Sequence, residues 1–175
     1  MFVFLQLAFI AQLAVVSDSE MKPQIDSIVK NSGLNTVVFI NISEPDHNMT
    51  FESFERGLME GAEKAPVVVS NIGPVSEELC VLMAKFRRNA FVLTAGNQAI
   101  ELEFPPTSAC LLNNILFVGT QKSSSNYGKA VRISIPATNG TEATTLAAVK
   151  LALFSEDTLL EGARLVNEFL AQPVP

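Results

Sequence analysis

The chain has 175 residues, of which 48% are hydrophobic and 17% charged, and its formal net charge is −6 at pH 7. This length suits one domain with a substantial core, and the composition is globular rather than disordered. The negative charge argues against nucleic acid as a partner, because the phosphate backbone would be repelled. With a single histidine, His47, and two cysteines without metal-ligand spacing, the sequence predicts no metal site and indicates no cofactor.

The first 17 residues, MFVFLQLAFIAQLAVVS, form an apolar run with small residues near its end. Two interpretations of residues 1–16 stay open: a signal peptide, or the first buried strand of the domain. No Lys or Arg precedes the run, and Gln6 and Gln12 interrupt it. Because the run is also short for a bilayer, we expect no stable membrane span. Residues 13–175 are expected to form a single domain.

Short apolar runs alternate with helical patterns along the rest of the chain. Strands are expected at 12–16, 36–42, 66–70, 90–94, 115–119 and 130–135. Most of these runs lack polar alternation, which is typical of strands covered on both faces. Helices are expected at 21–31, 51–63, 76–88, 141–154 and 157–171, where apolar residues recur at helical spacing. The alternation predicts an α/β fold with a mainly parallel, doubly wound sheet flanked by helices.

Three glycosylation sequons begin at Asn41, Asn48 and Asn139. We expect Asn48 and Asn139 to be usable if the chain enters a secretory pathway, but not Asn41, which ends an apolar strand. Cys80 and Cys110 could form one disulfide in a secreted protein, or remain two buried thiols. The sequence thus favours a secreted or secretory-pathway glycoprotein.

Five segments carry a resemblance to a known family: LAVVSDSEMKPQIDSIVKNSG, VVFINIS, AFVLTAGNQ, PPTSACLLNNILFVGTQKSSSNYGKAVRISIPA and NGTEATTLAAVKLAL. In this order they resemble the C-terminal two-thirds of the catalytic domain of subtilisin-like serine proteases. VVFINIS resembles that family's strand ending in Asn-Met-Ser, AFVLTAGNQ its strand ending in Ala-Gly-Asn, and the last segment its Gly-Thr-Ser-Met-Ala helix. The resemblance covers Leu13 to the C-terminus and implies a subtilisin-like domain truncated on its N-terminal side.

By position, the resemblance places Asn97 on the family's oxyanion-hole asparagine and Glu142 on its nucleophilic serine. It also places Ser43 near the family's substrate-binding strand, where Pro45 removes a backbone donor. Residues 45–74 look like additional material between strands.

The departures from the family concern the catalytic groups. A carboxylate at Glu142 cannot take over from the serine, because the acyl-enzyme would be an anhydride formed by a poor nucleophile. The family's histidine base and its orienting aspartate belong to a part of that fold lying before residue 1. His47 lies in the wrong segment, and no His-Gly-Thr-His stretch follows Asp18. We therefore expect Asn97 to be vestigial, and Glu142 to be non-catalytic and favoured by the helix dipole.

The sequence thus predicts a catalytically inactive homologue of subtilisin-like serine proteases, which acts as a binding or scaffold domain or is a gene remnant. A truncated sheet would expose an edge, which predicts self-association or a protein partner. Two alternatives stay open. One is a fragment of an active serine endopeptidase. The other is a doubly wound domain that binds a small ligand at the carboxyl ends of its strands.

Overall fold

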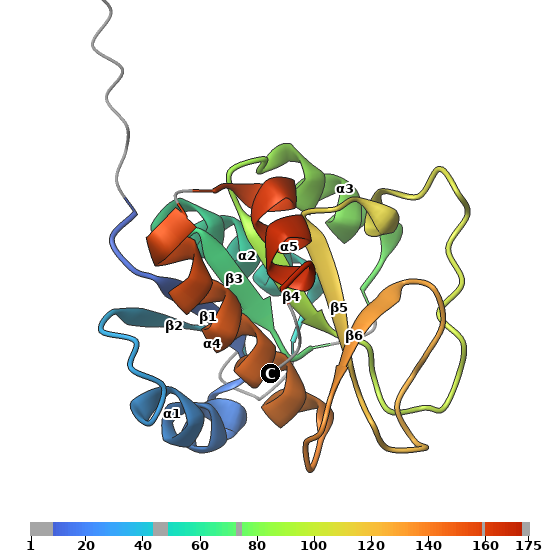
Figure 1. Ribbon diagram of the computed structural model, residues 1–175, viewed down its shortest axis with the longest axis horizontal. Helices are drawn as coiled ribbons and strands as arrows, with labels where there is room; N and C mark the ends of the chain where they lie inside the picture. The colour runs from blue at the N-terminus through green and yellow to red at the C-terminus, as the bar shows by residue number, and fades with distance from the viewer. Residues whose placement is uncertain (1–8, 44–48, 73–74, 159, 173–175) are drawn as a thin grey trace, which may run out of the picture.

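Six parallel strands form one sheet in the computed structural model, which describes residues 9–43, 49–72, 75–158 and 160–172 (Figure 1). Their spatial order is β2-β1-β3-β4-β5-β6, and every neighbouring pair is parallel. The strands are β1 (Leu13–Ser17), β2 (Val37–Asn41), β3 (Val67–Ser70), β4 (Ala90–Thr94), β5 (Ile115–Thr120) and β6 (Val131–Ile135). All residues of β1, β3, β4 and β5 are buried.

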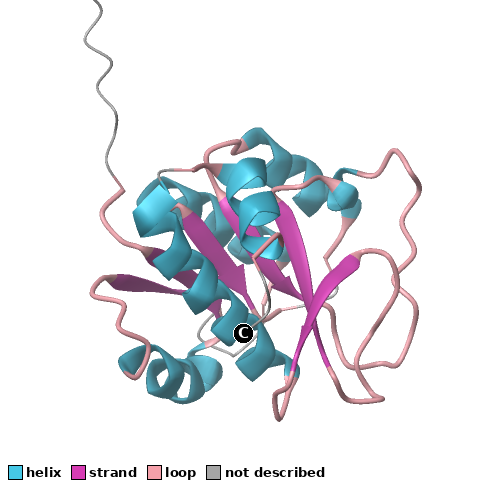
Figure 2. Cartoon of the chain, viewed as in Figure 1, coloured by secondary structure: helices cyan, strands magenta, loops and turns pink. Residues whose placement is uncertain are grey.

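Helices cover both faces of the sheet (Figure 2). One core cluster joins the sheet to α1 (Lys22–Lys30), α4 (Gly140–Thr158) and α5 (Gly162–Leu170). The other joins it to α2 (Phe51–Lys64) and α3 (Glu77–Lys85). Two short 3-10 helices, η1 (Ser19–Met21) and η2 (Ala109–Leu111), lie in connections. The predicted doubly wound α/β fold is confirmed.

Small residues let two helices approach the sheet closely. Buried alanines, among them Ala143 and Ala147, form much of the α4 surface that faces the strands. On α2, a Cβ added at Gly57 would lie 2.4 Å from Ile42 Cγ2 and 2.8 Å from Val16 Cγ1. Glycine is therefore required at this contact, because even one methyl group would overlap side chains of the core.

The N-terminal apolar run contributes a central strand. Residues 13–16 belong to β1, which is paired with both β2 and β3. Processing after residue 16 would remove this strand from the interior of the sheet. Residues 1–8 lie outside the described part of the chain. No helix in the described part is both long and apolar enough to cross a bilayer.

The segment 45–74, which looks like additional material by comparison with the family, contains α2 and β3 where a helix and a strand are predicted, and β3 lies between β1 and β4. One expectation about the elements is wrong. The last helix does not begin at 157, because α4 continues to Thr158 and α5 begins only at Gly162. Gly162 has a φ of +50°, and a Cβ there would lie 2.0 Å from the Arg87 carbonyl oxygen. This tertiary contact ties the start of α5 to the residues just before β4.

Candidate functional site

A pocket of about 220 Å³ lies at the carboxyl ends of β3 and β4, beside the N-terminus of α4. It is lined by Asn71, Thr94, Ala95, Gly96, Asn97, Gln98, Asn126, Gly140 and Thr141. In the sheet, β2 lies on one side of β1 and β3 lies on the other. The direction in which successive strands are added therefore reverses at β1, and the pocket lies next to this point, at the end of β3. Doubly wound folds bind ligands at the carboxyl edge near such a switch point.

Polar side chains replace the apolar ones where the three central strands end. Ser17, Asn71 and Thr94 follow the apolar residues of β1, β3 and β4 that pack against α4. The pairing of Val16 with Ser70 and of Ser70 with Leu93 puts the three polar residues at the same level across the sheet.

Two of these three residues, Ser17 and Asn71, carry buried polar atoms with no hydrogen-bond partner among the described residues. Both polar atoms of the Asn71 side chain are buried and unpaired, as are Ser17 Oγ and Thr145 Oγ1. Buried polar groups are nearly always satisfied in folded proteins, and each unpaired group costs about 1–3 kcal/mol. Asn71 lines the pocket. The amide of Asn71 therefore has unused hydrogen-bonding capacity at the wall of the pocket.

The loop that carries Asn97 is held by another asparagine. Asn126 Oδ1 accepts hydrogen bonds from the backbone N–H groups of Gln98 and Ile100 at 2.9 and 3.2 Å. Its Nδ2 donates to the Ala95 carbonyl at 2.8 Å. Asn126 is buried, so these bonds fix the loop after β4 at the mouth of the pocket. Its segment, SSSNYG, has the composition of a polar turn, and nothing local in the sequence shows which backbone groups Asn126 contacts.

Asn97 lies next to the first turn of α4. A Cβ added at Gly140 would lie 3.4 Å from Asn97 Oδ1 and 2.9 Å from Thr94 Oγ1. Asn97 is itself exposed. The structure thus brings Asn97 together with the Gly140–Thr141 turn, two positions singled out from the sequence.

Glu142 does not line the pocket. Its carboxylate accepts hydrogen bonds from the Thr138 hydroxyl and, at 2.7 Å, from the Thr138 backbone N–H. The Glu142 N–H donates to Asn139 Oδ1 at 2.9 Å. The side chains of Asn139 and Glu142 therefore cap the N-terminus of α4. The Thr138 hydroxyl, then the Thr138 N–H and more weakly Lys122, lower the pKa of Glu142 below its usual value. These contacts are those of a helix cap.

The remaining candidate residues lie away from the carboxyl-edge pocket or outside the described part of the chain. Ser43 follows β2, which is separated from β4 by β1 and β3, and it contacts Asn41 rather than Asn97. Asp18 accepts the Glu20 backbone N–H at 2.7 Å and so caps η1. His47 and Asn48 lie outside the described residues. The strand that lies beside β4 at the pocket is β3. Asn71, which directly follows β3, therefore lines the pocket, although it was not among the residues predicted from sequence.

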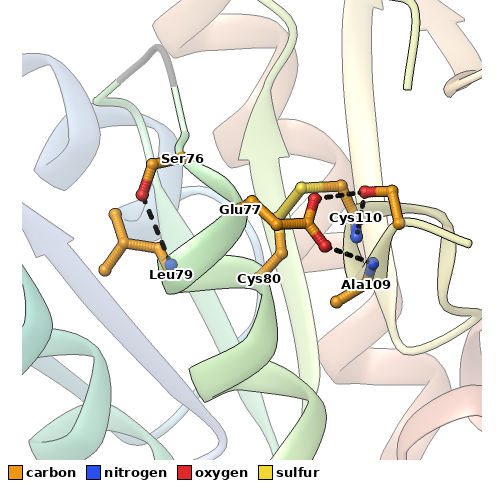
Figure 3. Close-up of a disulfide and its surroundings, with 7 residues drawn as sticks. Ser76, Glu77, Leu79, Cys80, Ala109 and Cys110 are labelled. Carbon is orange, nitrogen blue, oxygen red and sulfur yellow. Dashed lines mark hydrogen bonds between the residues drawn. A yellow bond between two sulfur atoms is a disulfide. The ribbon is translucent and has the colours of Figure 1, made fainter. Parts of the chain in front are cut away.

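A disulfide joins Cys80 on α3 to Cys110 on η2, and both residues are buried (Figure 3). Beside it, the Glu77 carboxylate accepts hydrogen bonds from Ser108 Oγ at 2.5 Å and from the Ala109 backbone N–H at 2.7 Å. The Ser108 hydroxyl first, and then the Ala109 N–H, lower the pKa of Glu77. The disulfide therefore anchors the long connection between β4 and β5, which begins with the Asn97 loop.

A larger pocket, of about 350 Å³, opens at the amino ends of the strands. Its polar lining is largely paired. Gln12 donates to Glu156, and Arg88 Nε lies 3.2 Å from Glu161 Oε1. Because these groups satisfy one another, this pocket lacks the unpaired amide found at the carboxyl edge.

The carboxyl-edge pocket can donate and accept hydrogen bonds, but no charged side chain lines it. In the described part of the chain, no cluster of three or more His, Cys, Asp or Glu side chains could hold a metal ion. A comparison with models of known protein families gives no match to the chain, and a comparison with curated protein sequences finds no significant relative.

Proposed function

We propose that the chain is a subtilisin-like domain without catalytic activity, which binds a short peptide segment in the pocket at the N-terminus of α4. The pocket volume of about 220 Å³ is below the range usual for drug-sized ligands, and suits one residue of an extended peptide. Its neutral amides and hydroxyls match the uncharged N–H and C=O groups of a peptide backbone.

The unpaired amide of Asn71 carries this proposal. A peptide N–H and C=O would satisfy Asn71 Oδ1 and Nδ2, both of which are buried without a partner among the described residues. The side chain of Asn97 and the first turn of α4 offer further donors on the opposite wall. Such a constellation favours binding of a neutral, hydrogen-bonding group.

Binding without cleavage is supported by the arrangement around Glu142. Its carboxylate is engaged by Thr138, and the Thr141 hydroxyl next to it lies 4.0 Å from the Met21 sulfur. No described histidine, lysine or carboxylate lines the pocket to activate that hydroxyl. Nucleophilic catalysis needs such a base within hydrogen-bond reach.

Two measurements on the purified chain test the proposal. Calorimetric titration with a pool of blocked tetrapeptides should show binding that Asn71→Ala weakens by about tenfold, the cost of one buried hydrogen-bonded group. The control Asn113→Ala lies before β5, at the other end of the sheet, and should bind like the wild type. Intact-mass analysis after incubation with a fluorophosphonate probe should show no adduct. A stoichiometric adduct would restore the endopeptidase alternative, and a ligand unaffected by Asn71→Ala would exclude this pocket.

A second role, self-association, is supported by the β2 edge. This strand pairs only with β1, and its residues Val37, Val38 and Phe39 are half-buried. It carries no charge or proline, the features that usually protect an edge strand. The other edge, β6, contains Arg132. An unmodified chain is therefore expected to dimerise through β2, which sedimentation over a range of concentrations would detect.

A further inference from the structure

We infer that Asn41, at the exposed end of the edge strand β2, is an N-glycosylation site whose glycan covers this edge of the sheet. From sequence, the sequon Asn41-Ile42-Ser43 is expected to be unsuitable because it ends an apolar strand. In the structure, Ile42 is buried at 2% exposure, whereas Asn41 is exposed. The alternation of a strand directs these two neighbours to opposite faces. The exposure of Asn41 therefore removes the ground for expecting that a glycan would not fit there.

The asparagine and serine of this sequon are already in contact. Asn41 Oδ1 accepts hydrogen bonds from the Ser43 hydroxyl at 2.6 Å and from the Ser43 backbone N–H at 3.2 Å. These bonds use the amide oxygen. No described group accepts a hydrogen bond from Asn41 Nδ2, the atom that would carry the sugar. A glycan on Nδ2 would displace no hydrogen bond between the described residues.

The Asn139 sequon differs in its surroundings. Asn139 Oδ1 accepts from the Glu142 N–H and from Gln24 Nε2, and the asparagine begins the first turn of α4. The next two residues, Gly140 and Thr141, line the carboxyl-edge pocket. A glycan on Asn139 would crowd that pocket, whereas one on Asn41 would lie beyond the end of β2, two strands from β3.

The modification is a group transfer. Asn41 Nδ2 attacks the anomeric carbon of a lipid-diphosphate-linked oligosaccharide, and a C–N bond forms. The bond from that carbon to the diphosphate oxygen breaks, the lipid diphosphate leaves with the electron pair, and Nδ2 loses one proton. The Cys80–Cys110 disulfide fits the oxidising compartment in which this transfer occurs.

Covering β2 has a physical consequence. An open strand edge without charges pairs readily with another chain, and a bulky, solvated modification at its end prevents such pairing. Glycosylation at Asn41 would therefore keep monomeric a chain that otherwise dimerises through β2. The opposite edge strand, β6, differs from β2 because it contains the charged residue Arg132, which disfavours pairing with another chain.

The test expresses residues 1–175 in cultured animal cells. Deglycosylation by peptide N-glycosidase in heavy-oxygen water, followed by peptide mass spectrometry, should show conversion of Asn41 to labelled aspartate. Ser43→Ala should abolish this label, and Ser43→Thr should retain it. An unlabelled Asn41 would overturn the inference, whether the chain stays in the cytosol or is exported with sugar only on another sequon.

A second readout concerns the edge itself and needs no variant. Enzymatic removal of the glycan from the folded, purified protein should shift its sedimentation from monomer towards dimer. A glycosylated chain that remains monomeric after deglycosylation would refute the protective role.

Discussion

Removal of the disulfide tests how far it stabilises the domain. Cys80 and Cys110 are 30 residues apart in sequence, and the bond closes a loop that contains β4 and its long following connection. Loop-closure entropy for this length predicts a loss of about 3.6 kcal/mol in the free energy of unfolding when both cysteines become alanine. This is a large share of the roughly 5–15 kcal/mol expected for a natural domain.

The assay is urea unfolding followed by far-UV circular dichroism, comparing the wild type with Cys80→Ala/Cys110→Ala. The wild type unfolded in the presence of a reductant is the matched control and should approach the double variant. Amide hydrogen exchange should rise first in the connection between β4 and β5 and least in the strands. A stability loss below about 1 kcal/mol would refute the reasoning, since that is well under the range typical of native disulfides.

The remaining predictions concern packing, pH and catalysis. Gly57→Ala should lower the free energy of unfolding by about 1–3 kcal/mol, measured by urea unfolding, because its Cβ would lie 2.4 Å from Ile42 Cγ2. Gly162→Ala should lower the melting temperature more, since it adds a backbone clash at 2.0 Å to a positive φ. The lowered pKa of Glu142 means that its contribution is fully present above the usual value of 4.5 and is lost as the pH falls through the lower folded pKa. Glu142→Gln should therefore flatten the acid limb of a plot of melting temperature against pH. Glu142→Ser should still show no peptidase activity against a fluorogenic casein, because no described base lines the site; cleavage by this variant would contradict that reasoning.

The strands and most helices could be predicted because their signals are local. Continuous apolar runs such as AFVLT mark strands buried on both faces, and β4 begins and ends where predicted. The break between α4 and α5 could not be predicted in the same way. It depends on the contact of Gly162 with the carbonyl of Arg87, which is 75 positions earlier in the chain.

The candidate site was predictable only in part. The Gly-Thr turn and the Ala-Gly-Asn strand end mark two of its walls, and the structure brings Asn97 beside Gly140. Asn71 could not be predicted as a site residue, because its segment, SNIGP, has the composition of an ordinary loop. Only the sheet order, which places β3 next to β4, shows that Asn71 lies at the pocket. The separation of Ser43 from Asn97 could not be predicted either, since strand order is a non-local property. The exposure of Asn41 likewise follows from the position of β2 at the edge.

The most direct measurement is a nuclear magnetic resonance titration of the isotope-labelled chain with blocked tetrapeptides, observing the side-chain amide of Asn71. We predict that this resonance and the backbone amides of Gly96, Asn97 and Thr141 shift together while the peptide stays intact. Cleavage of the peptide, or shifts confined to the amino-end pocket around Arg88, would contradict the assignment of a non-catalytic binding site to the N-terminus of α4.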